Sequence, residues 1–268
     1  MKDSIRRGVI FFMVMVGIVF LKETGRLKSD LAKIIVAAVI IFAVVYAIRG
    51  FGKKRQLKEL QAQCRKDAEQ GDADAQVNLG QTYEEGDRDI APDPVQAVFW
   101  YRKSADQGHP FAQFNLGRMY ESGQGVAQDQ TQAAEWFRKA ADQDWDLAQA
   151  KLGQMYEEGR GVAQDQAQAF VWYSKAAAVP YNDLAQNQLG LMYEQGRGVA
   201  QDHAQAADWF RKAAGQGCAS AQFNLGRLYA SGHGVTQDNT QAVRWYRKAA
   251  KQGDAKAQDA LRVMGLLK

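Results

Sequence analysis

Histidine and cysteine are the side chains in this sequence best suited to metal or redox chemistry. His109, His203 and His233 are dispersed, and none has a histidine or cysteine neighbour at the spacing of a metal site. We therefore expect surface histidines and no bound metal. Cys64 and Cys218 are far apart in the sequence and form no disulfide framework, so we expect two small, buried side chains.

Glutamates at a regular interval raise the possibility of paired carboxylates for acid–base chemistry. Glu84, Glu121, Glu157 and Glu194 recur at one position of a repeated pattern. No nucleophile, base and orienting group can be assembled around them, so we expect a solvated helix edge. The sequence thus predicts neither an enzyme nor a cofactor site.

Aromatic pairs and a glycine-rich phrase offer two further sites. Tryptophan followed by Tyr or Phe stands at positions 100, 136, 172, 209 and 245. Alanines at helical spacing around each pair favour a packed core over a stacking platform for sugars or bases. The phrase GVAQD begins at residues 125, 161 and 198, and GVTQD begins at 234. A phosphate-binding loop would need a preceding strand and a third glycine, and both are missing.

Charge separates the first 70 residues from the rest. Residues 1–70 hold 14 Lys and Arg against 6 Asp and Glu, whereas residues 71–268 hold 20 against 24. The mildly acidic remainder argues against nucleic acid as a partner.

Two apolar stretches near the N-terminus predict a membrane hairpin. They cover residues 8–21 and 31–51 when the flanking lysines are allowed to reach the interface. A signal peptide is the alternative for the first stretch, but no small-residue cleavage site follows it. Ten Lys and Arg outside the hairpin against four in its loop place both ends in the cytoplasm. We expect a membrane anchor over 1–52, in a bacterial inner membrane.

From residue 71 onward the sequence repeats every 36 or 37 residues. In the second repeat, Leu116 and Tyr120 lie on one face of a first helix, and Trp136 and Phe137 lie on one face of a second. The GVAQD phrase joins the two helices, and Asp129 is placed to cap the second. Equivalent caps are expected at Asp93, Asp165, Asp202 and Asp238, with glycines 108, 217 and 253 ending the second helices.

The ends of the array read as half repeats. Residues 53–70 match a lone second helix, and residues 254–268 match a lone first helix, as expected of capping units. The Leu-Gly glycine of each first helix is expected to let the paired helices approach closely. The predicted fold is an all-α solenoid of five repeats over 71–253, preceded by two transmembrane helices.

The repeated pattern A-x-x-x-L-G-x-x-Y-x-x-G-x-G-V-x-x-D-x-x-x-A-x-x-W-Y/F-x-K-A-A resembles the Sel1-like repeat, a relative of the tetratricopeptide repeat. The resemblance covers about three quarters of the chain. It implies an α/α superhelix whose concave face binds proteins or peptides. Some disulfide-rich members bind penicillin-like molecules, but they carry a cysteine pair in each repeat, which this chain lacks.

The same resemblance implies a groove lined by first-helix residues around each Leu-Gly pair. The candidate groove residues are Asn78, Gln81, Phe114, Asn115, Arg118, Lys151, Gln154, Gln188, Phe223, Asn224 and Arg227. These positions vary between repeats, and their amides and cations suit an extended peptide with one or two acidic groups. Around Arg138 and Lys139 on a second helix we expect only solvent, and we expect Trp145 to be an exposed anchor.

We therefore expect a membrane-anchored scaffold that binds partner proteins or peptides. The alternative is an envelope-exposed ligand-binding protein or β-lactamase-like hydrolase, with its repeats outside the membrane. A purely structural spacer is a third reading.

Overall fold

The computed structural model describes residues 59–87 and 89–267, and it is entirely helical apart from turns and joints. The chain divides into two compact units, Met1–Lys66 and Asp67–Lys268. Residues 59–69 are helical.

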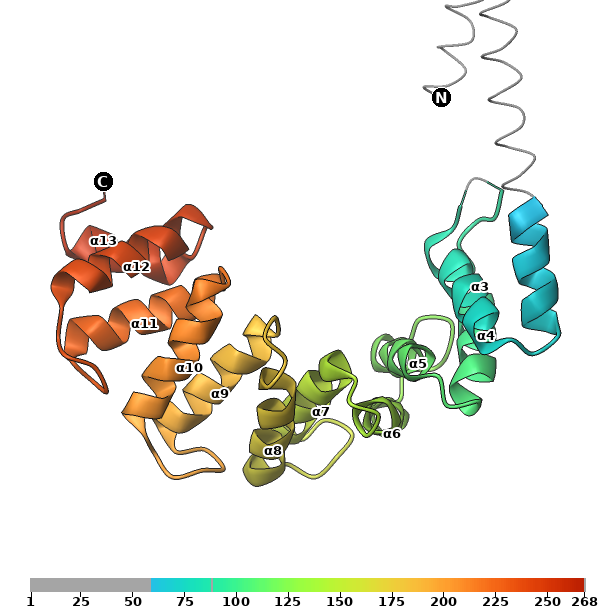
Figure 1. Ribbon diagram of the computed structural model, residues 1–268, viewed down its shortest axis with the longest axis horizontal. Coiled ribbons are helices and arrows are strands. Elements are labelled where there is room, and N and C mark those ends of the chain that lie inside the picture. The colour runs from blue at the N-terminus through green and yellow to red at the C-terminus, as the bar shows by residue number, and fades with distance from the viewer. Residues whose placement is uncertain (1–58, 88, 268) are drawn as a thin grey trace, which may run out of the picture. The chain divides into compact units, whose positions relative to one another are not determined.

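In the second unit, helices follow one another in pairs along a curved row, in which α5 and α7 lie on the inner side and α6 and α8 on the outer side (Figure 1). First helices are α3 (Ala73–Glu85), α5 (Pro110–Ser122), α7 (Asp146–Glu158), α9 (Asp183–Gln195) and α11 (Ala219–Ser231). Second helices are α4 (Pro94–Asp106), α6 (Gln130–Ala141), α8 (Gln166–Ala177), α10 (His203–Gly215) and α12 (Asn239–Lys251), and α13 (Ala255–Val263) follows alone.

Each second helix begins at an aspartate cap. The Asp129 carboxylate accepts hydrogen bonds of 2.9 and 3.0 Å from the first free N–H groups of α6. These bonds satisfy donors that a helix start leaves unpaired. The same pair of bonds is made by Asp93, Asp165, Asp202 and Asp238. The predicted caps are confirmed.

Positive backbone φ angles follow the second helices, as predicted. Gly108, Gly217 and Gly253 have φ of 95, 104 and 89°. Asp144 takes the glycine position after α6 with φ of 60°, and it is the single non-glycine residue with positive φ in the described chain. Aspartate tolerates this conformation better than most residues.

The glycine of each Leu-Gly pair sets the distance between the two helices of a repeat. A Cβ placed on Gly117 would lie 2.8 Å from ring carbons of Phe137, which is fully buried. Carbon atoms in contact prefer about 3.5–4.0 Å, so only glycine permits this approach. The same relation holds for Gly80 with Tyr101, Gly153 with Tyr173, Gly190 with Phe210 and Gly226 with Tyr246. The predicted close approach is confirmed.

In the second to fifth repeats, the second glycine of the joint rests on the preceding repeat. A Cβ on Gly125 would lie 2.1 Å from the carbonyl oxygen of Pro94, the first residue of α4. Gly161, Gly198 and Gly234 have the same relation to the first residues of α6, α8 and α10. Val126 and Val162 then pack against the core, as predicted for Val126. The joint therefore fixes one repeat on the next as well as turning the chain.

At the C-terminal end, Leu261 of α13 is buried with Tyr246 in the last core cluster, in agreement with the predicted lone helix. The predicted membrane spans at 8–21 and 31–51 lie outside the described residues. Among the helices that the structure does describe, none combines the length and apolar character needed to cross a bilayer.

Candidate functional site

Glutamates near the ends of the first helices pair with cations of the following repeat. Glu84 of α3 pairs with Arg118 of α5, with 3.2 Å between Oε1 and Nη2, and also accepts a 2.7 Å hydrogen bond from the Tyr101 hydroxyl. Glu194 of α9 pairs with Arg227 of α11 at 2.5 Å. Burial, and then the hydrogen bond from its hydroxyl to the carboxylate, raise the pKa of Tyr101.

The second repeat carries the same arrangement with two cations on one carboxylate. Glu121 of α5 lies 3.1 Å from Lys151 of α7 and 3.0 Å from Arg160 in the joint that follows α7. Arg160 also contacts Glu158, at 2.5 Å. The carboxylate is therefore held from the next first helix and from the next joint together.

Glu157 of α7 completes the series. It pairs with Arg197 of the next joint, and it accepts hydrogen bonds from Gln188 of α9 at 3.4 Å and from the Tyr173 hydroxyl at 2.9 Å. Burial, and then the nearby Glu157 charge, raise the pKa of Tyr173. We call Glu84, Glu121, Glu157 and Glu194 with these partners the glutamate ladder.

The glutamate ladder corrects our expectation of a solvated helix edge. Its carboxylates retain only 9–20% of their exposure, and every one has a basic partner from the next repeat. The partners lie 30–40 residues away in the sequence. A pattern within one repeat therefore does not reveal them.

The structure brings part of the predicted groove into this ladder. Four of the eleven candidates supply ladder donors: Arg118, Lys151, Gln188 and Arg227. Gln154 donates a 2.9 Å hydrogen bond to Glu158 on its own helix. Asn78 is exposed and Gln81 is half-buried on α3.

The four remaining candidates present little surface. Phe114 and Phe223 are half-buried, because each ring packs 5.6–5.7 Å from an aromatic ring of the paired second helix. Asn115 and Asn224 are buried, and Asn224 donates a 3.1 Å hydrogen bond to Asn187, one repeat earlier. These four side chains therefore pack beneath the exposed ladder residues and contribute little to the surface itself.

Cations on the second helices contact aromatic rings. Lys139 Nζ lies 3.7 Å from the Trp136 ring centroid, and Arg138 lies over the ring of Tyr156 in the next repeat and donates to its hydroxyl. The same lysine position covers the tryptophan in the other four repeats, through Lys103, Lys175, Lys212 and Lys248. Our expectation of solvent alone around Arg138 and Lys139 was wrong, because cations are attracted to ring faces within about 6 Å.

Trp145 is half-buried rather than an exposed anchor, with its ring edge-to-face against Phe111 at 5.8 Å. The rings of His203 and His233 stack at 5.4 Å, and His109 Nε2 lies 3.0 Å from a carboxylate oxygen of α3. Within residues 59–87 and 89–267, no three His, Cys, Asp or Glu side chains gather at metal-binding distance.

Buried glutamines are a polar feature that we did not predict. Gln113 Nε2 donates to the carbonyl of Ala105 at 3.2 Å, and its Oε1 accepts from Gln143 at 2.8 Å. Gln76, Gln149, Gln186 and Gln222 are buried at the same position. The sequence signal for them is the Ala-Gln pair that recurs in every first helix. Without its partners, such a glutamine looks like an ordinary polar surface residue.

The helix pairs stack in series. Joint glycines rest on the preceding pair, and the glutamate ladder links each pair to the next. This arrangement defines an α/α solenoid of a repeat protein. The chain belongs to the Sel1 repeat family, whose repeat matches residues 73–109, 110–145, 146–178, 183–218 and 219–254.

Two solved structures show the same architecture at substantial sequence identity. A protective antigen present in uropathogenic Escherichia coli strains, described as displaying an SLR fold, is 44% identical with a TM-score of 0.70. The match covers 73% of this chain and 41% of that one, so this chain spans less than half of the antigen's length. A Sel1 repeat protein from Oxalobacter formigenes is 39% identical, with a TM-score of 0.65 over 71% of this chain and 77% of that one. No curated protein sequence matches the chain.

Proposed function

We propose that this chain is a membrane-tethered scaffold that binds an extended segment of a partner protein along its first helices, and that it is not an enzyme. The observation that carries this proposal is the glutamate ladder. It holds Arg118, Lys151 and Arg227 at successive repeats while a third or more of each side chain stays exposed.

Fixed, half-exposed cations are well suited to binding a peptide. A guanidinium has five N–H donors, and among the described residues Arg118 donates to the side chains of Glu84 and Asn115. The remaining donors can take peptide carbonyls or an acidic side chain. Because the ladder already orders these long side chains, a partner avoids part of the ordering cost of about 0.5–1.5 kcal/mol per side chain.

Charge compensation narrows the chemistry of the partner. Each cation of the glutamate ladder lies beside a carboxylate, so the surface of the ladder is polar without a strong positive field. Such a surface favours backbone carbonyls and amides with one or two acidic groups over a polyanion. Nucleic acid, which demands clustered Lys and Arg, is therefore not proposed as a partner.

Photo-crosslinking in cells tests the binding surface. A benzoylphenylalanine placed at Gln154 or Gln188 should crosslink to one and the same protein, and placement at Glu135 on a second helix should not. The triple change Arg118→Gln, Lys151→Gln and Arg227→Gln should abolish those adducts. Equal adducts from first-helix and second-helix positions would contradict the proposed surface.

The membrane tether and its orientation form the second part of the proposal. The apolar stretches 8–21 and 31–51 and the basic residues around them support an inner-membrane hairpin with cytoplasmic repeats. Alkaline phosphatase fused after Lys268 should be inactive, and a fluorescent protein fused there should fluoresce. The reverse result would favour the envelope-exposed ligand-binding or hydrolase alternative.

A further inference from the structure

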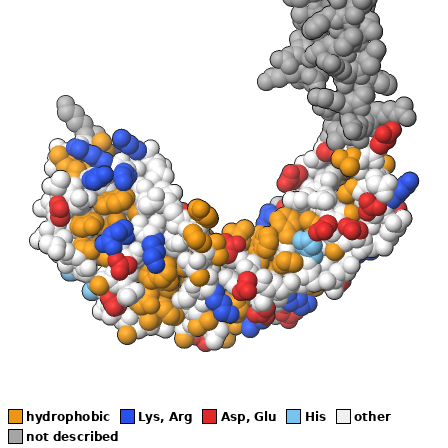
Figure 2. Space-filling view, in the orientation of Figure 1, with side chains coloured by type: hydrophobic (Ala, Val, Ile, Leu, Met, Phe, Trp, Pro, Cys, Tyr) orange, Lys and Arg blue, Asp and Glu red, His pale blue; other side chains and the backbone are white. Residues whose placement is uncertain are grey.

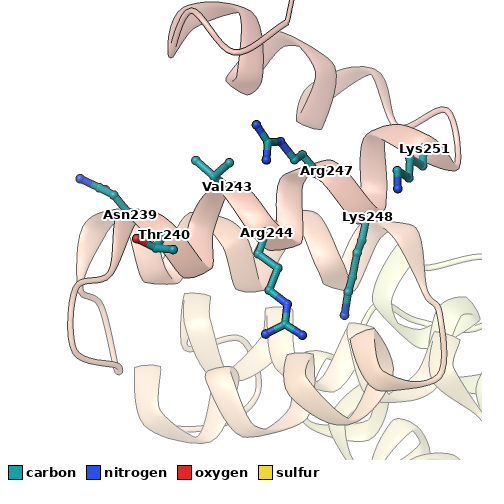
Figure 3. A pocket seen from close by; sticks show the side chains of 7 residues that line it. All are labelled: Asn239, Thr240, Val243, Arg244, Arg247, Lys248 and Lys251. Atoms are coloured by element: carbon teal, nitrogen blue, oxygen red, sulfur yellow. The ribbon is translucent and has the colours of Figure 1, made fainter.

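The C-terminal end of the solenoid carries an open depression of about 590 Å³ rimmed by cations. All of its lining comes from α12: Asn239, Thr240, Val243, Arg244, Arg247, Lys248 and Lys251 (Figure 3). In Figure 3, Arg244 and Lys248 extend to one side of α12 and Arg247 to the other. The depression therefore offers basic groups on both of its flanks.

The register of the repeats explains why this depression exists. The first residues of α4, α6, α8 and α10 each receive a joint glycine of the next repeat. Asn239 is the corresponding first residue of α12, and α13 is 9 residues long where the first helices have 13. In the described chain, no joint rests on Asn239. At Asn239 and Thr240 the depression therefore includes the place that a joint glycine contacts on the earlier second helices, and from there it runs along α12 to Lys251.

Two of the four cations around this depression, Arg244 and Lys251, are particular to the last repeat. Arg244 occupies a position held in the earlier repeats by Phe99, Glu135, Val171 and Asp208. Lys251 occupies a position held by Asp106, Asp142, Ala178 and Gly215. Within residues 59–87 and 89–267, Arg244, Arg247 and Lys251 form no ion pair. Helix α12 therefore presents positive charge that no carboxylate compensates, unlike the cations of the glutamate ladder.

The opposite charge lies at the other end of the same solenoid. Residues 239–268 hold seven Lys and Arg against two Asp, whereas residues 67–93 hold nine Asp and Glu against one Arg. Figure 2 shows Lys and Arg gathered over α12 and α13, and Asp and Glu over α3 and the segments that flank it. Asp74 and Glu85 are exposed members of the acidic end.

We propose that the cationic α12 face binds the acidic first repeat of a second copy, so that copies associate head to tail. The two surfaces differ, so the contact is heterologous and adds copies in series rather than stopping at a symmetric dimer. Its attraction between exposed charges weakens as salt screens them. This association is independent of peptide binding on the glutamate ladder.

Sedimentation velocity of the full chain in a non-ionic detergent tests the proposal. The average mass of the wild type should rise with protein concentration at 50 mM salt, and the rise should be lost at 500 mM. Arg244→Glu with Arg247→Glu should stay a single copy, and so should Asp74→Lys with Glu85→Lys. An equimolar mixture of these two variants should associate, because each acidic surface then meets a basic one.

The matched control carries the same charge change on other second helices. Lys139→Glu with Lys212→Glu should associate as the wild type does, with an unchanged helical circular dichroism signal. A wild type whose mass is independent of concentration at both salt levels overturns the proposal. So does unchanged association of Arg244→Glu with Arg247→Glu, or a mixture of the two charge-reversed variants that stays monomeric.

Discussion

Replacing Gly117 by alanine should destabilise the fold, although alanine is the better helix former. The exchange gains about 1 kcal/mol of helix propensity at an ordinary interior site. Here the new Cβ would lie 2.8 Å from two ring carbons of Phe137, close to 1 Å nearer than the preferred contact of about 3.5–4.0 Å. Phe137 is fully buried and cannot swing into solvent. Overpacking of this kind costs about 1–3 kcal/mol, and we expect its upper range, giving a net loss of about 1–2 kcal/mol.

Gly215→Ala supplies the internal control. Gly215 lies in α10, and a Cβ placed on it meets no atom within 4 Å. The same chemical change should therefore stabilise the protein by about 0.5–1 kcal/mol. Urea unfolding of the full chain in a non-ionic detergent, followed by circular dichroism, measures both as midpoint shifts of opposite sign. Unchanged slopes would show that the shifts report stability.

A second change locates the effect on the ring. Phe137→Leu opens space beside Gly117, at the cost expected for a smaller core side chain. The double variant Gly117→Ala with Phe137→Leu should then lose less stability than the sum of the single changes. If Gly117→Ala stabilised the protein as much as Gly215→Ala, the close-packing argument for the Leu-Gly pair would fail.

Three further outcomes follow from the contacts described above. Arg227→Ala should lower the free energy of unfolding by about 2–3 kcal/mol, because it leaves Glu194, which is 9% exposed, without its cation. Arg118→Ala should lower it by less than about 1 kcal/mol, because its partner Glu84 is more exposed. Denaturant midpoints of the two variants test this order. Asp129→Ala should cost about 1 kcal/mol through the lost cap, and Asp129→Asn should restore most of it, as judged by thermal unfolding. Burial and a neighbouring carboxylate raise the pKa of Tyr101, so the unfolded chain ionises first and stability should fall as the pH rises above about 10; Tyr101→Phe should reduce that alkaline loss in a pH series of unfolding curves.

Much of the fold was predictable because it depends on contacts within one repeat. The cap at Asp129 and the approach of Gly117 to Phe137 both join residues about 20 or fewer positions apart. A fivefold repetition showed which residue types those contacts need. Asp144 replaces the glycine of the turn after α6, and its positive φ shows that the turn keeps its shape with another residue.

The candidate site was less predictable because its contacts join different repeats. Periodicity identifies equivalent positions, but it does not say which position of one repeat touches which position of the next. Glu121 therefore looked like a solvated side chain, although Lys151 and Arg160 hold it in place. The same limit applied to Arg138, whose partner Tyr156 belongs to the next first helix.

The contacts of the joint glycines allow whole repeats to be deleted from or added to the gene. Gly125 and Gly161 occupy equivalent places and are 36 residues apart. Excision of residues 125–160 would bring Gly161 onto the Pro94 carbonyl, in the position that Gly125 now holds, and the new neighbours would meet through the same backbone contact. Unequal recombination between the nearly identical GVAQD segments can therefore shorten or lengthen the protein by whole repeats without creating a junction that the fold has not already used.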